Sequence, residues 1–286
     1  KMCSGDWESI DFQRVPSKAS MNYRKAFGRH DQARYAAYLA AVEKGEAKMN
    51  AGAIYPYEIF RSIVTGHPSP QEIKQLDLQW KSMPNWLEGN EHYGMVIADT
   101  SGSMSGLPIL VSVSLALYFA ERNVGPFKDF WMNFSTTPTL QRVRGNNLRE
   151  KYDNMDKHNW CGSTDLQAAF ELILNTALAN RVPAKDMPTV LYIVSDMEFN
   201  NAGSLTNEAA IRQKYQAAGY KLPRIVWWNV NARNDQHPIR VDANGMALVS
   251  GASPSILKSL LSAKTFDPMS IVYETVNKPR YARVTV

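Results

Sequence analysis

The sequence predicts an α/β fold: a doubly wound, mainly parallel central sheet with helices on both faces, preceded by a small helical segment. From residue 93 onward, short and nearly uninterrupted apolar runs alternate with stretches of helical length, as parallel strands covered on both faces do. Before that point, apolar residues recur at helical spacing. We therefore expect a helical N-terminal segment over residues 1–88, packed on the main domain. An α/β domain with a C-terminal extension should cover residues 89–286.

The N-terminal segment has helix patterns over residues 31–45, 55–66 and 69–80. Asp31 stands where it can cap the first of them. The third begins with a capping box, in which Ser69 is the N-cap residue and an acidic residue follows three positions later. These helices are short and would be marginal alone, because helix nucleation is costly. They should therefore pack on something larger.

The α/β region begins with a strand that ends in an aspartate and closes with a less clearly patterned tail. A polar stretch over residues 147–160 reads as helix or loop. The other expected strands and helices follow one another in near alternation. Strands are expected at 93–99, 127–135, 138–143, 188–196, 224–231 and 245–251, and helices at 108–123, 165–182, 207–220 and 253–263.

Composition narrows the classes of protein. Of 286 residues, 44% are hydrophobic and 21% charged, which is ordinary for a globular protein. No uninterrupted apolar run reaches the length of a membrane span, and the first residues lack the apolar region of a signal peptide. The two cysteines, Cys3 and Cys161, make no disulfide framework. We expect a cytoplasmic protein without a membrane partner.

The net charge of +5 is unevenly distributed. Residues 212–286 hold eleven basic and four acidic side chains, and the rest of the chain is slightly acidic. A basic C-terminal third could contact nucleic acid or an acidic partner, or it could be a solvated surface with no partner.

The candidate site lies where expected strands end in polar residues. Asp99 ends the first strand of the α/β region and is followed by Ser101 and Ser103; Asp196 ends another strand, and Thr164 lies in a loop before a helix. Ligands of such sheets bind at the carboxyl ends of the strands, near the switch point. Carboxylates and hydroxyls are hard ligands, which favour Mg²⁺, or Ca²⁺ or Mn²⁺, over zinc or copper.

The two serines alternate around Gly102. If this turn is extended, both hydroxyls can face one point. The glycine would let the backbone bend closely around that point.

These residues resemble the metal-ion-dependent adhesion site of von Willebrand factor type A (VWA) domains, and the resemblance covers residues 93–263. It implies that Ser101, Ser103 and Thr164 contact the ion through hydroxyls, while Asp99 and Asp196 often act through water. The ion then keeps room for a carboxylate from a partner protein.

Two further acidic residues are possible accessories of the site. Many VWA domains have glycine after the last aspartate, whereas this chain has Met197 and then Glu198. Glu198 either adds negative charge near the ion or is a solvated loop carboxylate. Asp165 follows Thr164 directly and is better placed to cap the next helix than to contact metal.

A second resemblance concerns RNA-binding proteins. The run "SDME" at 195–198 and the G-x-T-D loop at 162–165 are similar to the C-terminal domain of Ro/TROVE proteins. Residues 14–59 resemble a TROVE-related family of unknown function. In TROVE proteins RNA is held mainly by a helical-repeat ring, so the resemblance implies RNA association for this chain only indirectly.

We therefore expect a non-enzymatic interaction domain that binds a divalent cation and, through it, an exposed Asp or Glu of a protein partner. An RNA-associated, Ro-like module is the alternative. A Mg²⁺-dependent phosphohydrolase is a second alternative, because an aspartate at the end of a first strand also occurs in phosphotransferases. Position 101, however, is serine where such enzymes have a second aspartate. The sequence has no P-loop, GxSxG or HExxH motif.

Overall fold

The structure is a computed structural model, and its chain forms two compact units. One comprises residues 1–85 and 144–155, and the other residues 86–143 and 156–286. The described residues are 2–88, 94–133, 137–155, 160, 166–197, 208–231, 246–251, 256, 273, 276–277 and 279–281.

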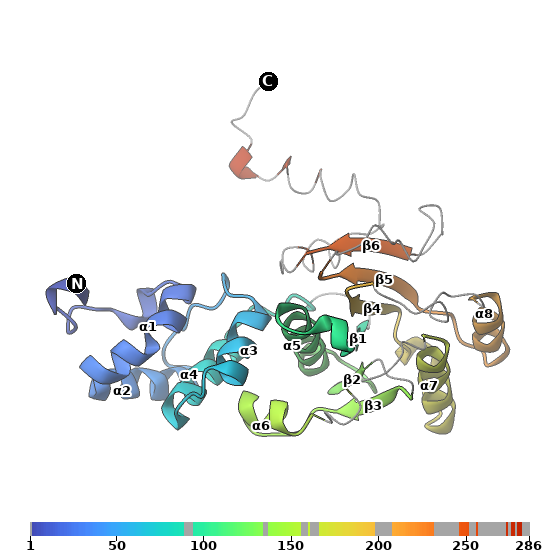
Figure 1. The fold of residues 1–286 in the computed structure, drawn as a ribbon, viewed down its shortest axis with the longest axis horizontal. Helices are drawn as coiled ribbons and strands as arrows, with labels where there is room; N and C mark the ends of the chain where they lie inside the picture. Colours follow the sequence, from blue (N-terminus) through green and yellow to red (C-terminus); the bar gives the residue numbers. More distant parts are fainter. Residues whose placement is uncertain are drawn as a thin grey trace. The chain divides into compact units, whose positions relative to one another are not determined.

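The first unit is helical (Figure 1). Aromatic and aliphatic side chains from its helices and from the segment before them form its core, among them Phe12, Phe27, Tyr35 and Leu39. Its helices are α1 (Ser17–His30), α2 (Gln32–Glu43), α3 (Pro56–Thr65), α4 (Pro70–Lys81) and α6 (Leu148–Asp153).

The capping box at the start of α4 is confirmed. The Glu72 amide donates to Ser69 Oγ at 3.4 Å, and the Ser69 amide donates to Glu72 Oε2 at 3.0 Å. Asp31 also occupies the N-cap position of α2, but its side chain makes no capping hydrogen bond. That carboxylate instead pairs with Arg34 at 2.8 Å. A nearby guanidinium has thus replaced the backbone amides as its partner.

Helix α6 belongs to the helical unit, although its sequence lies within the α/β region. The Leu148 amide donates to Asp77 Oδ1 of α4 at 3.1 Å, and Leu148 itself is fully buried. The Tyr152 ring meets Phe60 of α3 edge to face, with ring centroids 5.3 Å apart. These long-range contacts explain why residues 144–155 group with the N-terminal helices.

The second unit contains a six-stranded sheet in the order β3-β2-β1-β4-β5-β6. All neighbouring strands run parallel except β3, which is antiparallel to β2 and ends one edge of the sheet. This confirms the α/β class and the mainly parallel sheet. The strands are β1 (Gly94–Ala98), β2 (Phe130–Asn133), β3 (Thr139–Arg142), β4 (Val190–Ser195), β5 (Arg224–Asn229) and β6 (Met246–Ser250).

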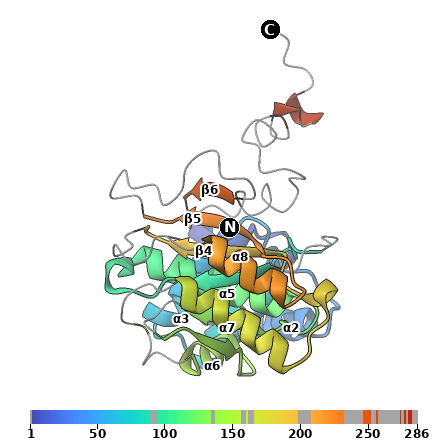
Figure 2. The ribbon, with the colours of Figure 1, turned by 90° about the vertical axis from the view of Figure 1, so that its right-hand side faces the viewer.

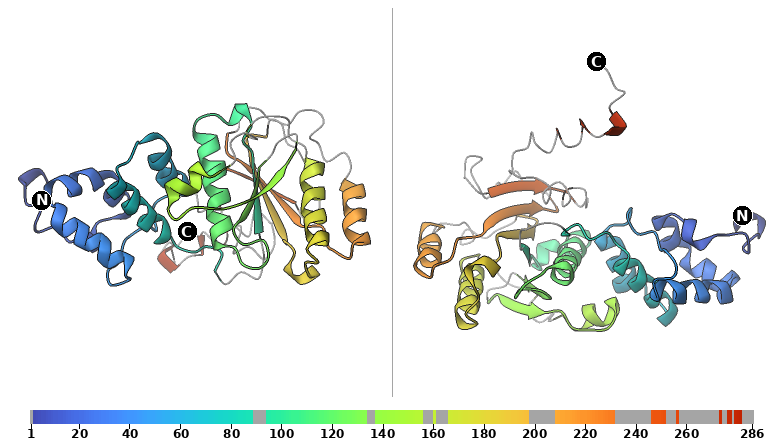
Figure 3. Two further views of the ribbon diagram at one scale, coloured as in Figure 1. Left: turned by 90° about the horizontal axis from the view of Figure 1, so that it is seen from below. Right: turned by 180° about the vertical axis from the view of Figure 1, so that it is seen from behind.

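Helices cover both faces of this sheet. Helix α5 (Leu107–Arg122) lies on one face, and α7 (Leu166–Ala179) and α8 (Glu208–Ala217) lie on the other (Figure 3). The last two run side by side (Figure 2) and are joined by an ion pair between Lys214 and Glu171. The helix expected at 253–263 falls mostly outside the described residues.

The central strands are buried on both sides. Every residue of β1 and β4 is buried, and so are the adjacent Trp227 and Trp228 of β5. Successive side chains of a strand point to opposite faces, so the two tryptophans are buried on opposite faces of the sheet. None of the helices in the described ranges is long and apolar enough to cross a membrane.

Candidate functional site

The switch point of the sheet lies between β1 and β4. The chain leaves β1 for β2 on one side, and it later returns to place β4 on the other side. The two strands pair in parallel, with Ala98 opposite Val194. The residues that follow them, Asp99 and Ser195–Asp196, therefore emerge at the same edge. Ligands of open α/β sheets bind at this place.

Asp99 is held by hydrogen bonds to both of its carboxylate oxygens. Oδ1 accepts from the Ser101 amide at 2.9 Å, and Oδ2 accepts from the Ser195 hydroxyl at 2.5 Å. The residue is only 1% exposed. Burial raises the pKa of Asp99 above its usual range; the Ser195 and Ser101 hydrogen bonds oppose the rise, and the nearby Asp196 charge adds to it.

The hydroxyls of Ser101 and Ser103 lie 3.1 Å apart. The two side chains are thus close together, but the backbone differs from the expected extended turn, because Gly102–Met104 forms a 3₁₀ turn. Met104 is fully buried and fixes that turn to the core. Gly102 has no positive φ, and a Cβ there would meet no atom within 4 Å. The structure therefore shows no conformational or steric requirement for glycine at this position.

Asp196 follows β4 directly and is 3% exposed. The next residue, Met197, has a φ of 64°, a left-handed conformation that favours glycine. Its amide donates to Ser195 Oγ at 3.0 Å, and its side chain is buried in the main core. The residue after Asp196 thus has a glycine-like backbone although it is methionine.

The structure brings four of the five predicted metal residues to the switch-point edge: Asp99, Ser101, Ser103 and Asp196. Thr164, the fifth, lies outside the described residues, as do Asp165 and Glu198. No cluster of three or more His, Cys, Asp or Glu side chains that could hold a metal occurs in the described ranges. A cation here would therefore depend on hydroxyl oxygens as well as carboxylates.

Sequence reasoning missed the role of Ser195. Its hydroxyl donates to Asp99 and accepts from Met197, so it connects the two strand ends. Ser112 of α5 was also missed; this buried serine donates to the Val194 carbonyl at 3.2 Å. A signal existed for both, because each is a polar residue in a mostly apolar, buried element.

Comparison with known proteins identifies a viral relative and a solved structure of similar fold. The "Uncharacterized protein L728" of Acanthamoeba polyphaga mimivirus is 29% identical over 290 residues, covering 95% of this chain. The chain spans about half the length of that protein. The crystal structure of the Deinococcus radiodurans RO (RSR) protein has a TM-score of 0.50 at 16% identity, covering 91% of this chain and 62% of the other. The expected likeness to Ro proteins is thus supported at the level of the fold.

Two family models divide the chain between them. The model "Domain of unknown function (DUF2828)" matches residues 1–90. The model "Domain of unknown function (DUF7788)" matches residues 94–282, well over half of the chain and the whole described sheet. The chain therefore belongs to the DUF7788 family.

Proposed function

We propose that the α/β unit is an interaction domain that binds a divalent cation between the ends of β1 and β4 and, through it, an acidic group of a partner protein. The observation that carries the proposal is the pairing of a buried, oriented carboxylate with two converging hydroxyls. Asp99 is held on both oxygens, and the Ser101 and Ser103 hydroxyls lie 3.1 Å apart beside it.

The donor chemistry fits a hard cation. Ser101 and Ser103 would hold it through their hydroxyls, together with Thr164, and Asp99 and Asp196 would provide nearby negative charge. Mg²⁺, Ca²⁺ and Mn²⁺ all prefer such oxygen ligands. Both Asp99 oxygens already accept hydrogen bonds from the protein, which suits a carboxylate that acts mainly through water.

A cation with few direct carboxylate ligands keeps net positive charge. Bound here, it would supply that charge to an Asp or Glu of the partner. We propose that the domain acts by binding and is not an enzyme. Asp165 and Glu198 remain candidate accessory residues.

Calorimetric titration with Mg²⁺, Ca²⁺ and Mn²⁺ tests the cation. We expect saturable binding to the wild type, and a loss of about tenfold or more in affinity in Ser101→Ala and Ser103→Ala. Ser105→Ala is the matched control, because this exposed hydroxyl donates to the Gly102 carbonyl and has no other hydrogen bond to the described residues. Equal cation affinity in all four proteins would rule the site out.

The partner contact is tested by affinity capture with Mg²⁺ or with EDTA. Partners that use the cation should be lost both on chelation and in Ser101→Ala, and retained by Ser105→Ala. Partners that survive chelation contact some other surface.

RNA association is a second candidate, favoured by the charge of the C-terminal third. Residues 212–286 carry eleven basic and four acidic side chains, and electrostatic RNA binding weakens steeply with salt. A filter-binding series at rising salt checks this. No retention of RNA at low salt would remove the candidate.

A further inference from the structure

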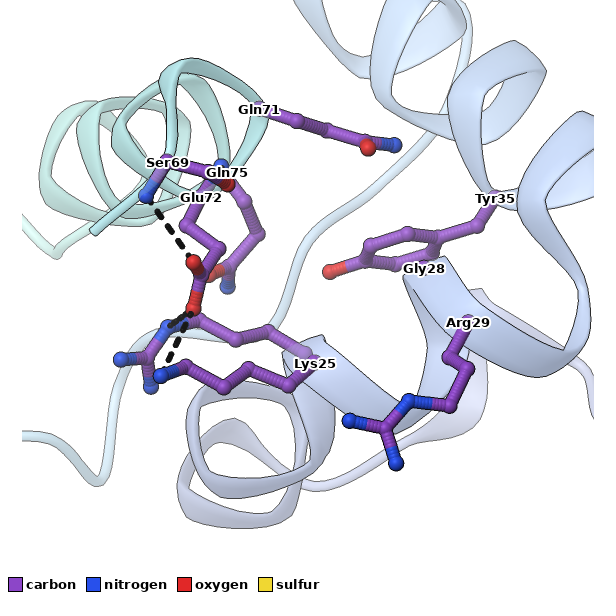
Figure 4. Close-up of a pocket in the computed structure, with 9 residues that line it drawn as sticks. Lys25, Gly28, Arg29, Tyr35, Ser69, Gln71, Glu72 and Gln75 are labelled. Carbon is purple, nitrogen blue, oxygen red and sulfur yellow. Dashed lines mark hydrogen bonds and ion pairs between the residues drawn. The ribbon is translucent and has the colours of Figure 1, made fainter.

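A cavity of about 310 Å³ lies in the helical unit, among α1, α2 and α4 (Figure 4). Its lining is mostly polar. Arg24, Lys25 and Arg29 come from α1, Tyr35 comes from α2, and Glu72 and Gln75 come from α4. This volume is at the lower end of the range of about 300–1,000 Å³ for ligand pockets.

Four buried polar atoms of the cavity lining have no hydrogen-bond partner among the described residues. Arg24 Nε and Glu72 Oε1 form an ion pair with each other, whereas the Tyr35 hydroxyl and Gln75 Oε1 have no such partner among those residues. Tyr35 and Gln75 are 2% and 0% exposed. Tyr35 points into the cavity (Figure 4). Burial keeps the pKa of Tyr35 far above its usual value, so its hydroxyl is a neutral donor. Buried polar groups are nearly always paired, and a polar ligand in the cavity would pair Tyr35 and Gln75.

The charges around the cavity are predominantly positive. Arg24 and Lys25 share one carboxylate, Glu72, at 3.4 and 3.8 Å. Arg29 is exposed at the cavity and forms no ion pair with any acidic side chain of the described ranges. The N-terminus of α4, which begins after Ser69, also lines the cavity and adds a partial positive charge. The surplus of cations favours an anionic ligand.

We propose that this cavity binds a small phosphate monoester. Lys25 and Arg29 would hold the phosphate, as Lys and Arg commonly do. The uncharged part of the ligand would reach inward, accepting a hydrogen bond from Tyr35 and donating one to Gln75. A bare phosphate would leave the inner groups unsatisfied, so the ligand needs both a donor and an acceptor beyond its phosphate. This site is separate from the cation site and does not depend on it.

Calorimetry on the full chain with three probes tests the site: inorganic phosphate, glucose 6-phosphate and uridine 5′-monophosphate. We expect at least one monoester to bind about tenfold or more tighter than inorganic phosphate, because only a monoester satisfies the inner groups. Saturation by none of the three at millimolar concentration, or equal affinity for all three, would overturn the proposal.

Two variants locate the binding. Arg29→Gln should weaken every phosphate probe that binds. Tyr35→Phe should weaken the preferred monoester by about tenfold and leave inorganic phosphate unchanged. Arg14→Gln is the charge control, because Arg14 is exposed and pairs with Asp11 away from the cavity. If Arg29→Gln and Tyr35→Phe bind the monoester as the wild type does, the cavity is not the site.

Thermal unfolding without ligand gives an independent readout. Tyr35→Phe removes a hydroxyl with no partner, so its Tm should match or exceed that of the wild type. Tyr38→Phe is the matched control, because that hydroxyl donates to the Lys48 carbonyl at 3.0 Å, and its Tm should fall. A fall in Tyr35→Phe as large as that in Tyr38→Phe would mean that the Tyr35 hydroxyl is already satisfied, by water for example, and would overturn the proposal.

Discussion

The Ser195 hydroxyl donates to Oδ2 of Asp99 across 2.5 Å, between residues 96 positions apart in the chain. This bond joins the end of β4 to the end of β1. Asp99 is therefore oriented by the protein itself, from the neighbouring strand on one oxygen and from the Ser101 amide on the other.

Replacing Ser195 by alanine should destabilise the α/β unit. The change leaves Asp99 Oδ2 and the Met197 amide without a buried partner, and a buried polar group left unsatisfied costs about 1–3 kcal/mol. Urea unfolding measures the loss. Ser105→Ala, at an exposed hydroxyl, should stay within about 0.5 kcal/mol of the wild type. Similar small losses in both variants would contradict the role assigned to Ser195.

Substitutions at Met197 should give an unusual order of stability among the variants. Its φ of 64° costs a residue with a side chain about 1–2 kcal/mol relative to glycine, while its buried side chain contributes about 2–5 kcal/mol. Both Met197→Gly and Met197→Ala should therefore be less stable than the wild type. Met197→Gly should nevertheless be more stable than Met197→Ala, by about 1 kcal/mol. Chemical denaturation of the pair tests this; a more stable alanine variant would show that the conformation carries no strain.

Gly94 should tolerate no side chain. A Cβ there would lie 2.8 Å from Tyr192 Cε2 and 3.4 Å from Phe119 Cε1, and both rings are buried. Gly94→Ala should cost about 1–3 kcal/mol through overpacking. Gly102→Ala is the control, since a Cβ there has open space; it should be near neutral. A neutral Gly94→Ala in thermal unfolding would show that the rings can move apart.

Glu72 should make the stability of the helical unit depend on pH. Burial opposes ionisation, but the Ser69 hydrogen bonds and the charges of Lys25 and Arg24 outweigh it and hold the pKa of Glu72 below its usual range. A lowered folded-state pKa means that the stabilisation is complete above the unfolded-state pKa. It is lost as the pH falls through the folded-state value.

The test compares the wild type with Glu72→Gln. At neutral pH the variant should lose about 1–2 kcal/mol, because the capping box and its charge are weakened. The difference should shrink at acid pH, where the wild-type carboxyl is protonated. Glu46→Gln, at an exposed position, should show no such trend. A difference for Glu72→Gln that is constant with pH would exclude an electrostatic origin.

The features that the sequence could predict were those signalled by a few neighbouring residues or by a periodic pattern. The apolar runs of β1 and β4 identified buried parallel strands, and the pattern of Ser69 and Glu72 identified a helix start, because each signal lies within a few residues. Likewise, a polar residue at the end of an apolar run marked Asp99 and Asp196 as site candidates.

The rest depended on contacts between distant residues. Ser195 meets Asp99 only because β1 and β4 pair in one register. The segment 144–155 joins the helical unit through bonds such as that from Leu148 to Asp77. Arg34 draws Asp31 away from its capping role. Tertiary packing determines which of several possible partners a side chain contacts, and a short sequence pattern carries no information about that packing.

The pairing of β1 with β4 has a consequence for how the chain can vary. Asp99 and Asp196 meet because two adjacent strands end side by side, so the length of chain between them does not set the geometry. Insertions in the surface connections that link these strands should change the number of residues between the two aspartates without moving either aspartate in space. A slip of one residue between β1 and β4 would separate them while leaving the chain length unchanged. A sequence search for related sites should therefore require each aspartate at a fixed position after its strand and allow any number of residues between the two strands.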